Sequence, residues 1–150
     1  MLVGPMQGAL LVLSEMIRRI DSVDEKFVYR MVKVSLYDAA NQAGQSATFD
    51  YWPITDAELS EYDFIVVDDV AETLRTYVAM KERLAACGAE VQLLTLIDKP
   101  VANRVEGMRP DFAPLLAGPD AWLIGEGMND GSSFMGEAWR CEKGVWVRNA

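Results

Sequence analysis

The sequence predicts an α/β fold with a mainly parallel sheet flanked by helices. Residues 63–67 and 90–97 are continuous apolar runs, typical of strands buried on both faces, and residues 73–86 between them have the pattern of a helix. A helix between two buried strands indicates a parallel βαβ unit. The chain has 150 residues, is 51% hydrophobic and contains no linker-like or repeated segment. We therefore expect a single domain over residues 1–150 with a substantial core.

The first third of the chain indicates one helix and one hairpin. Residues 9–20 are expected to form a helix, because apolar side chains recur at helical spacing and basic ones lie at the C-terminal end. Residues 26–36 alternate as a strand does, with apolar members Phe27, Tyr29, Met31, Val34 and Leu36. Residues 38–46 lack a hydrophobic period and predict a mobile loop, and residues 48–52 predict the returning strand.

Caps and turn residues mark the remaining elements. Thr55 and Glu58 have the spacing of a capping box and predict the start of a single helical turn. Gly88 is expected to close the helix over residues 73–86. Beyond Pro100 the chain is irregular, with frequent proline and glycine up to Gly118. Residues 121–125 and 144–147 predict two short strands.

Composition excludes several classes of function. The chain has no histidine, which rules out Ser-His-Asp hydrolysis, Cys-His proteolysis and histidine-rich zinc sites. Cys87 and Cys141 lack the spacing of a metal or redox pair, and we expect both to be buried thiols. A net charge of −9 argues against a nucleic-acid partner. Because neither a signal-peptide pattern nor a membrane-length apolar run occurs, we expect a soluble, cytoplasmic protein without a membrane partner.

Acidic and hydroxyl side chains follow the first apolar run. Ligands of parallel sheets bind at the carboxyl ends of the strands, so Asp68, Asp69 and Glu72 are expected to face a crevice. Thr73 and Thr76 come next, at a helix N-terminus whose free backbone N–H groups bind anions. This pattern suits a ligand with sugar hydroxyls and a phosphate, with the carboxylates accepting from the hydroxyls or holding Mg²⁺. An ordinary acidic helix start is the alternative.

Residues 66–76 have the sequence VVDDVAETLRT, which resembles the phosphoribosyl-pyrophosphate motif of type I phosphoribosyltransferases, most nearly the hypoxanthine-guanine and xanthine enzymes. Residues 2–8 fall where the family has its pyrophosphate loop, through Leu2, Val3 and Gly4. Residues 34–37 resemble the start of its flexible catalytic loop, through Ser35 and Tyr37. Residues 96–100 resemble the strand end whose lysine contacts the purine, and residues 110–112 with 118–125 resemble the hood over the base.

The resemblance implies a core over about residues 1–100, a small C-terminal hood over about residues 101–150 and a shortened N-terminal segment. It implies transfer of the 5-phosphoribosyl group from phosphoribosyl pyrophosphate to a 6-oxopurine, namely hypoxanthine, guanine or xanthine. It also implies a nucleoside monophosphate and pyrophosphate as products, Mg²⁺ as the cofactor, and a closure of residues 37–47 that would exclude water. A homodimer or tetramer is expected by the same analogy.

The resemblance also implies roles for individual residues. Asp68 and Asp69 would bind the ribose hydroxyls and Mg²⁺, and Glu72 would exchange the proton at purine N7. The 5′-phosphate would lie on the loop of Thr73, Leu74, Arg75 and Thr76, with Glu72 at its start. Lys99 would donate to the 6-oxygen, Trp122 would stack on the base, and the Leu123 backbone would contact the purine edge. Without the family, a lysine after a strand is usually solvated and a tryptophan in an apolar run usually lies in the core.

Several positions depart from the family pattern. Val3 stands in place of the pyrophosphate-loop lysine, and Glu72 in place of an aspartate. Leu74 stands in place of a glycine, and we expect this bulky residue to avoid a positive φ. Asn129 stands in place of a metal-binding aspartate, with Asp130 next to it as a substitute for metal or pyrophosphate contact. These departures motivate an alternative function, a catalytically impaired sensor or regulatory module that binds a purine nucleotide.

A phosphoacceptor receiver domain is a second alternative, because residues 65–69 and 98–100 also resemble its acid pair and its Lys-Pro turn. Only 30 residues separate Asp69 from Lys99, which leaves room for one helix and one strand. A receiver needs several more βα units between these positions, so the spacing argues against it.

Overall fold

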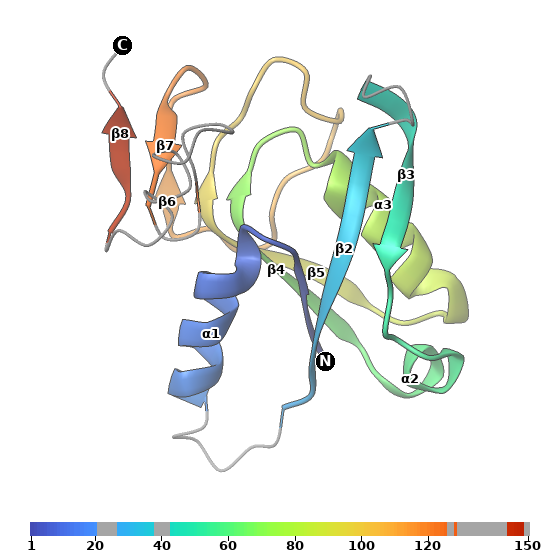
Figure 1. The fold of residues 1–150 in the computed structure, drawn as a ribbon. Helices are drawn as coiled ribbons and strands as arrows, with labels where there is room; N and C mark the ends of the chain where they lie inside the picture. Colours follow the sequence, from blue (N-terminus) through green and yellow to red (C-terminus); the bar gives the residue numbers. More distant parts are fainter. Residues whose placement is uncertain (21–26, 38–42, 126–127, 129–143, 149–150) are drawn as a thin grey trace.

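A computed structural model describes residues 1–20, 27–37, 43–125, 128 and 144–148. Its main sheet has six strands in the order β3-β2-β1-β4-β5-β6, and β7 and β8 form a separate two-stranded sheet (Figure 1). The strands are β1 (Leu2–Pro5), β2 (Tyr29–Tyr37), β3 (Ala43–Tyr51), β4 (Phe64–Ala71), β5 (Val91–Asp98), β6 (Leu115–Leu116), β7 (Trp122–Ile124) and β8 (Trp146–Arg148). In the main sheet β2 and β3 are antiparallel, and the other neighbouring strands are parallel. The predicted α/β class with a mainly parallel sheet is confirmed.

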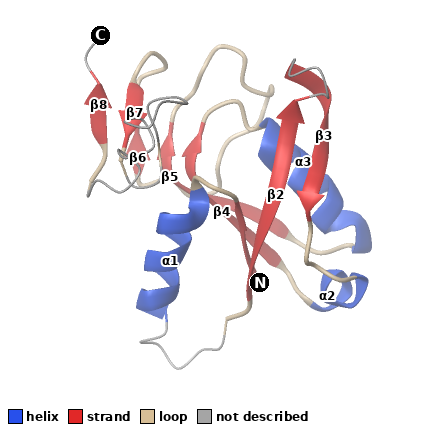
Figure 2. Cartoon of the chain, viewed as in Figure 1, coloured by secondary structure: helices blue, strands red, loops and turns tan. Residues whose placement is uncertain are grey.

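Helices cover both faces of the main sheet (Figures 1 and 2). The helices are α1 (Ala9–Ile20), α2 (Asp56–Glu61) and α3 (Arg75–Leu84), the last continued by a short 3₁₀ turn, η1 (Ala85–Cys87). On one face α1 packs on Leu2 and Val67. On the other, α3 and α2 pack on a larger cluster that includes Val3, Val66 and Leu93. Burial on both faces explains why the central strands are continuously apolar.

The local signals at α1 and α2 are confirmed. α1 has the predicted bounds, with Arg18 and Arg19 in its last turn. The capping box at α2 is complete: the Thr55 hydroxyl accepts from the backbone N–H of Glu58, and the Glu58 carboxylate accepts from the backbone N–H of Thr55 at 2.8 Å. None of the helices in the described part of the chain is long and apolar enough to cross a membrane.

The hairpin of β2 and β3 corrects one prediction. Residues 43–46, predicted as a mobile loop, are the first residues of β3, and residues 38–42 lie outside the described residues. Beyond the pairing of Pro5 with Val32, β2 leaves β1 and pairs with β3. Because backbone pairing with the neighbouring strand defines this part of the hairpin, it need not show an apolar period in the sequence.

The facing of β2 also differs from the prediction. Phe27 and Tyr29, predicted as apolar members, are exposed, whereas Val32 is fully buried. Met31 packs in the cluster under α1, and Val32 packs in the cluster under α3. In a strand covered on both faces, residues that point to either face are buried. An alternating pattern therefore fails to identify its core residues.

Several elements have other bounds than predicted. β4 continues through Asp68 and Asp69 to Ala71, because this whole stretch pairs with β5 up to Asp98. α3 begins at Arg75 rather than at residue 73. β6 was not predicted in the irregular segment, while the strands expected at residues 121–125 and 144–147 are present as β7 and β8, which pair with each other. Cys87, predicted to be buried, is exposed in the turn closed by Gly88, and Cys141 lies outside the described residues.

Candidate active site

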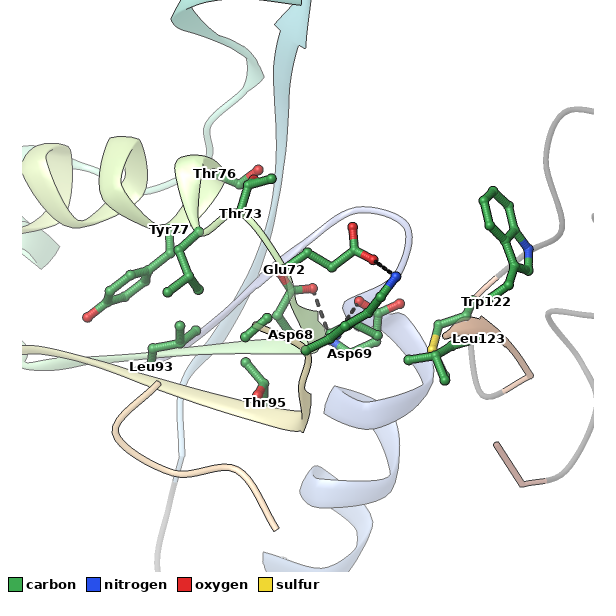
Figure 3. Close-up of a pocket in the computed structure, with 15 residues that line it drawn as sticks. Asp68, Asp69, Glu72, Thr73, Thr76, Tyr77, Leu93, Thr95, Trp122 and Leu123 are labelled. Carbon is green, nitrogen blue, oxygen red and sulfur yellow. Dashed lines mark hydrogen bonds and ion pairs between the residues drawn. The ribbon is translucent and has the colours of Figure 1, made fainter. Parts of the chain in front are cut away.

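A cavity of about 400 Å³ opens at the carboxyl ends of β4 and β5 (Figure 3). Its lining comes from the end of β4, the loop into α3, the end of β5 and the small C-terminal sheet. Its lining includes Asp68, Asp69, Glu72, Thr73, Leu74, Thr76, Thr95, Lys99, Trp122, Leu123 and Met128. The strand-end rule thus predicted the position of the cavity correctly.

Asp68 and Asp69 are partly buried on the last part of β4. The Asp68 carboxylate accepts from the backbone N–H of Asp69 at 3.0 Å, and the Asp69 carboxylate accepts from that of Val70 at 2.7 Å. Burial, followed by the negative charge of Asp69, raises the pKa of Asp68 well above its ordinary value. Two adjacent carboxylates under this repulsion favour a ligand that brings hydroxyl donors or a cation.

Gly8 brings the start of α1 against this pair. A Cβ atom built on Gly8 would lie 2.4 Å from Oδ2 and 2.7 Å from Cγ of Asp69. The carboxylate therefore occupies space that any other residue at position 8 would fill. The sequence analysis placed Gly8 at the end of the pyrophosphate-loop segment and before a helix, but it did not predict this contact, because a contact across 61 residues of chain leaves no local signal.

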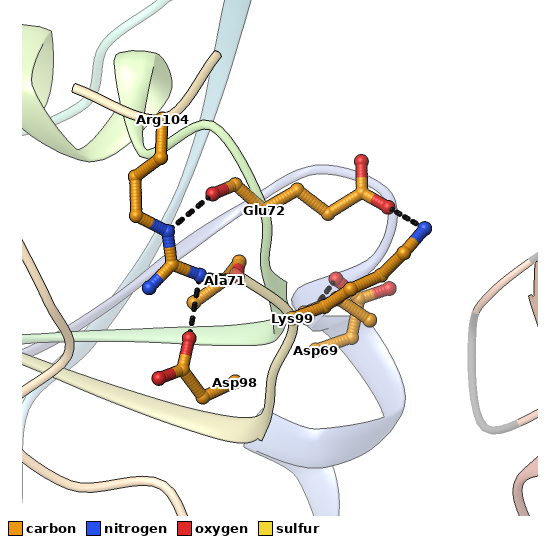
Figure 4. Close-up of polar contacts among 7 residues, drawn as sticks. Asp69, Ala71, Glu72, Asp98, Lys99 and Arg104 are labelled. Atoms are coloured by element: carbon orange, nitrogen blue, oxygen red, sulfur yellow. Dashed lines mark hydrogen bonds and ion pairs between the residues drawn. The ribbon is translucent and has the colours of Figure 1, made fainter. Parts of the chain in front are cut away.

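Glu72 and Lys99, which both line the cavity, form an ion pair with 2.6 Å between Lys99 Nζ and Glu72 Oε1 (Figure 4). Lys99 follows β5 and is 9% exposed, whereas the Glu72 side chain is about half exposed. This low exposure contradicts the expectation that, without the family, a lysine after a strand is solvated. The sequence predicted both residues for the site but not their pairing, which depends on the register of β4 and β5.

The segment from Thr73 to Thr76 runs from the end of β4 into the first turn of α3, and Thr73, Leu74 and Thr76 line the cavity. Leu74 has φ 62° and ψ 11°, the left-handed conformation that it was expected to avoid. Its side chain is only 6% exposed and belongs to the large core cluster, which offsets the backbone cost. Arg75 is exposed and does not line the cavity.

Arg104 is a site-supporting residue that the sequence analysis missed. Its guanidinium donates to the backbone carbonyls of Ala71 and Glu72 and to the Asp98 carboxylate (Figure 4). The segment around it was read as irregular chain, and the contacts span 32 and 33 residues. Only the folded structure brings this arginine to the backbone carbonyls of Ala71 and Glu72.

The small sheet supplies the other wall of the cavity. Trp122 and Leu123 on β7, with Met128, line it, and the Trp122 side chain is 52% exposed (Figure 3). Trp122 is therefore not a core residue. Leu123 pairs with Val147 of β8. Asn129 and Asp130 lie outside the described residues.

A family model described as "Phosphoribosyl transferase domain" matches residues 1–112. The chain belongs to this family. The hypoxanthine-guanine phosphoribosyltransferase of Lactococcus lactis subsp. lactis (strain IL1403) is 29% identical over 129 residues, which are 86% of this chain and 67% of that protein. A hypoxanthine phosphoribosyltransferase from Staphylococcus aureus has a TM-score of 0.79 at 20% identity, covering 99% of this chain and 74% of that one. A mutant hypoxanthine phosphoribosyltransferase from Trypanosoma cruzi, in a ternary substrates complex, has a TM-score of 0.80 at 16% identity, covering 99% and 75%.

The phosphoribosyltransferase resemblance predicted from the motifs is confirmed, including its hypoxanthine-guanine branch, and the solved structures share the fold. The position of one loop is corrected. Leu2, Val3 and Gly4 were assigned to the pyrophosphate loop, but they form β1 and are buried between β2 and β4. The turn from strand to helix is residues 6–8, next to Asp69. Val3 consequently lies in the core, and its lack of charge has no bearing on the site.

The flexible-loop residues of the phosphoribosyltransferase are also placed differently from the prediction. Ser35 and Tyr37 belong to β2, where they pair with Thr48 and Ala43 of β3. The Ser35 hydroxyl donates to the Asp50 carboxylate at 2.6 Å. Both residues thus lie in a strand of a paired hairpin rather than in a loop.

Proposed function

We propose that this phosphoribosyltransferase transfers the 5-phosphoribosyl group of phosphoribosyl pyrophosphate to a 6-oxopurine. One observation carries the proposal: three recognition elements surround a single cavity at the ends of two parallel strands. Asp68 and Asp69 match the ribose hydroxyls, the Glu72–Lys99 pair matches the edge of the base, and the loop into α3 matches a phosphate. The similarity to a curated hypoxanthine-guanine phosphoribosyltransferase supports the choice of purine.

The base edge explains the preference for a 6-oxopurine. A 6-oxopurine with its proton on N7 presents one donor, N7–H, beside one acceptor, the 6-oxygen. Glu72 accepts from the donor, and Lys99 donates to the acceptor. An ammonium group has three N–H donors, so Lys99 contacts the base while it still holds Glu72.

The reaction breaks the bond between ribose C1 and a pyrophosphate oxygen and forms a bond between C1 and a purine ring nitrogen. As the ring nitrogen attacks, the Glu72 carboxylate takes the N7 proton, which leaves the product base neutral. The cavity positions the two reactants for this displacement. The turn at residues 6–8, beside Asp69, is the part of the chain that we assign to the departing pyrophosphate.

The carboxylates of the site fit the Mg²⁺ that the family resemblance implies. Mg²⁺ prefers oxygen ligands and commonly uses one or two carboxylates together with substrate oxygens and water. Asp68 and Asp69 supply two such carboxylates, and no group of three or more metal-ligating side chains occurs in the described ranges. When bound, the ion neutralises charge on the leaving pyrophosphate.

The experiment that tests the proposal is pyrophosphate release from phosphoribosyl pyrophosphate and Mg²⁺ with hypoxanthine, guanine, xanthine or adenine. We expect release with at least one 6-oxopurine. Glu72→Gln keeps an acceptor for Lys99 but cannot take a proton, so kcat should fall by roughly 10²- to 10⁴-fold. Glu106→Gln, which changes an exposed acid outside the cavity, is the matched control.

A negative result has a defined meaning. If no base supports release while inosine monophosphate still binds, the protein is a purine-nucleotide sensor on the same fold. If neither release nor binding occurs, the proposal fails altogether. Val3, one departure that motivated the sensor, is a buried residue of β1 rather than a residue of the turn at residues 6–8. A homodimer or tetramer and a cytoplasmic location stay predictions.

A further inference from the structure

Three consecutive carbonyl groups of the loop into α3 are bound from one side by two neighbouring residues. Arg104 Nε donates to the carbonyl of Glu72 at 2.8 Å, and its Nη2 donates to that of Ala71. The backbone N–H of Val105 donates to the carbonyl of Thr73 at 3.0 Å. The backbone N–H of Lys99 also donates to the Ala71 carbonyl, at 3.0 Å. Residues 104 and 105, with this bond, thus fix three successive peptide units, which we call the clamped peptides 71–74.

The orientation of the clamped peptides decides where their N–H groups point. In a trans peptide the C=O of one residue and the N–H of the next point in opposite directions, and these three bonds are trans. With their carbonyls directed at Arg104 and Val105, the N–H groups of Glu72, Thr73 and Leu74 point away from these two residues. Neither Arg104 nor Val105 lines the cavity, whereas residues 71–74 do.

The left-handed backbone of Leu74 completes the arrangement. Successive N–H groups around a left-handed residue form a concave anion site, and α3 begins directly after it, at Arg75. A non-glycine residue holds this conformation only where its surroundings fix it. The clamp on the preceding carbonyls is one such constraint, and the burial of the Leu74 side chain is another.

Asp98 also binds the guanidinium of Arg104. Its carboxylate accepts from Arg104 Nη2 at 2.5 Å, and the Arg104 side chain is only 12% exposed. Glu72 accepts two hydrogen bonds: its carboxylate accepts from Lys99, and its backbone carbonyl accepts from Arg104 (Figure 4). Arg104 touches the backbone of the loop and not the cavity, so its action on a ligand passes through the loop.

We propose that Arg104 is a positioning residue that orients the N–H groups of residues 72–74 toward a ligand phosphate. This inference rests on the proposed function, because it assumes that the phosphate of a nucleoside monophosphate lies on this loop. Its quantitative consequence is the phosphate gain, which we define as the Kd of inosine divided by the Kd of inosine monophosphate.

The test compares the phosphate gain of the wild type, Arg104→Gln and Arg109→Gln. Arg104→Gln should lower the gain by about tenfold or more, the scale of one or two charged hydrogen bonds, while the Kd of inosine changes little. Arg109 is an exposed arginine of the same segment that does not line the cavity, so Arg109→Gln should leave both constants unchanged. Arg104→Lys keeps a charge but only part of the fork and should lie between the two.

Other outcomes separate the failures. Equal weakening of inosine and its monophosphate in Arg104→Gln would show a merely structural role and overturn the inference, as would an unchanged gain. A wild-type protein with no phosphate gain would instead overturn the proposed function, and the inference with it. If Arg104→Gln does not fold, Asp98→Asn releases the guanidinium from its carboxylate without removing it, and a selective fall in the gain is again expected.

Discussion

At the scale of single residues, the site depends on the absence of a side chain at Gly8. The Asp69 carboxylate occupies the space of a Cβ atom there. Gly8→Ala should displace it and raise the KM for phosphoribosyl pyrophosphate by about tenfold or more, because displacement of a site group by an ångström is costly. Steady-state kinetics measure this effect. Gly118→Ala is the control, since a Cβ atom at Gly118 meets nothing within 4 Å; equal KM values in both variants would contradict the contact.

The residues of the candidate site divide by how their position is determined. Asp68, Asp69 and Glu72 follow one apolar run and Lys99 follows the next, so the strand-end rule suffices to bring them together. Arg104 and Gly8 reach the site through contacts between distant segments, which no local pattern records. The sequence therefore predicted the groups that face the cavity, but not the groups that hold them in place.

At the scale of elements, the junction of β4 and α3 shows why a rule for one residue can fail. Leu74 takes a left-handed conformation that costs about 1–2 kcal/mol, while burying a leucine side chain gains about 1.5–3 kcal/mol. The expectation of a negative φ considered the first of these two energies and omitted the second. Whether residue 74 enters the core is decided by the packing of α3 on the sheet.

The same balance gives a stability prediction. Leu74→Ala loses the burial and keeps the strained backbone, whereas Leu74→Gly loses the burial but relieves the strain. Leu74→Gly should therefore be the more stable of the two by roughly 1 kcal/mol in urea unfolding, although both are less stable than the wild type. Ala79→Gly inside α3 is the control, because there glycine should cost about 1 kcal/mol. A less stable glycine variant at position 74 would contradict the strain.

The hydrogen bond between Tyr77 on α3 and Val91 on β5 should make the free energy of unfolding fall as the pH rises into the alkaline range. The Tyr77 hydroxyl donates to the carbonyl of Val91 at 3.2 Å, and burial, with the negative charge of Asp111, raises the pKa of Tyr77 to about 12. The unfolded chain releases this proton near pH 10. Between about pH 10 and 12 the folded state holds more protons than the unfolded state, so the stabilisation present below pH 10 is lost as the pH rises.

Tyr77→Phe isolates this effect. It should be less stable than the wild type at pH 8, because the Val91 carbonyl loses a donor, and the difference should shrink as the pH rises above 10. Urea midpoints of both proteins between pH 8 and 11.5 measure the difference. The other tyrosines and lysines titrate in both proteins and cancel in the comparison. A constant difference over this range would contradict the raised pKa.

Helices and strands were predictable where burial produces an apolar period in the sequence or where capping residues occur at a fixed spacing. The bounds of α1 and the capping box of α2 are examples, since both follow from contacts within a few residues. The outer part of the β2–β3 hairpin and the short β6 were missed, because backbone pairing with a neighbouring strand defines them and requires no period of apolar side chains. The extension of β4 to Ala71 is missed for the same reason.

At the scale of the whole molecule, the cavity joins parts that the chain order separates. β4, β5, the loop into α3 and the small sheet of β7 and β8 each contribute lining residues. Because these parts meet only in the folded state, a ligand of the cavity binds the folded protein and not the unfolded chain. Its binding free energy therefore raises the free energy of unfolding. Thermal stabilisation therefore reports directly on which ligand the cavity accepts.

The last prediction uses this linkage to test the 6-position of the base. Inosine monophosphate at about 100 times its Kd should add about 2.7 kcal/mol, which raises Tm by roughly 5–10 °C for a chain of this size. Adenosine monophosphate offers a 6-amino donor to the Lys99 ammonium, so one charged hydrogen bond is lost and its Kd should be about 10- to 150-fold higher. At the same concentration it should add only about 0.3–1.4 kcal/mol. Lys99→Gln, whose amide both donates and accepts, should bring the two Tm shifts together; equal shifts in the wild type would show that Lys99 does not contact the 6-position.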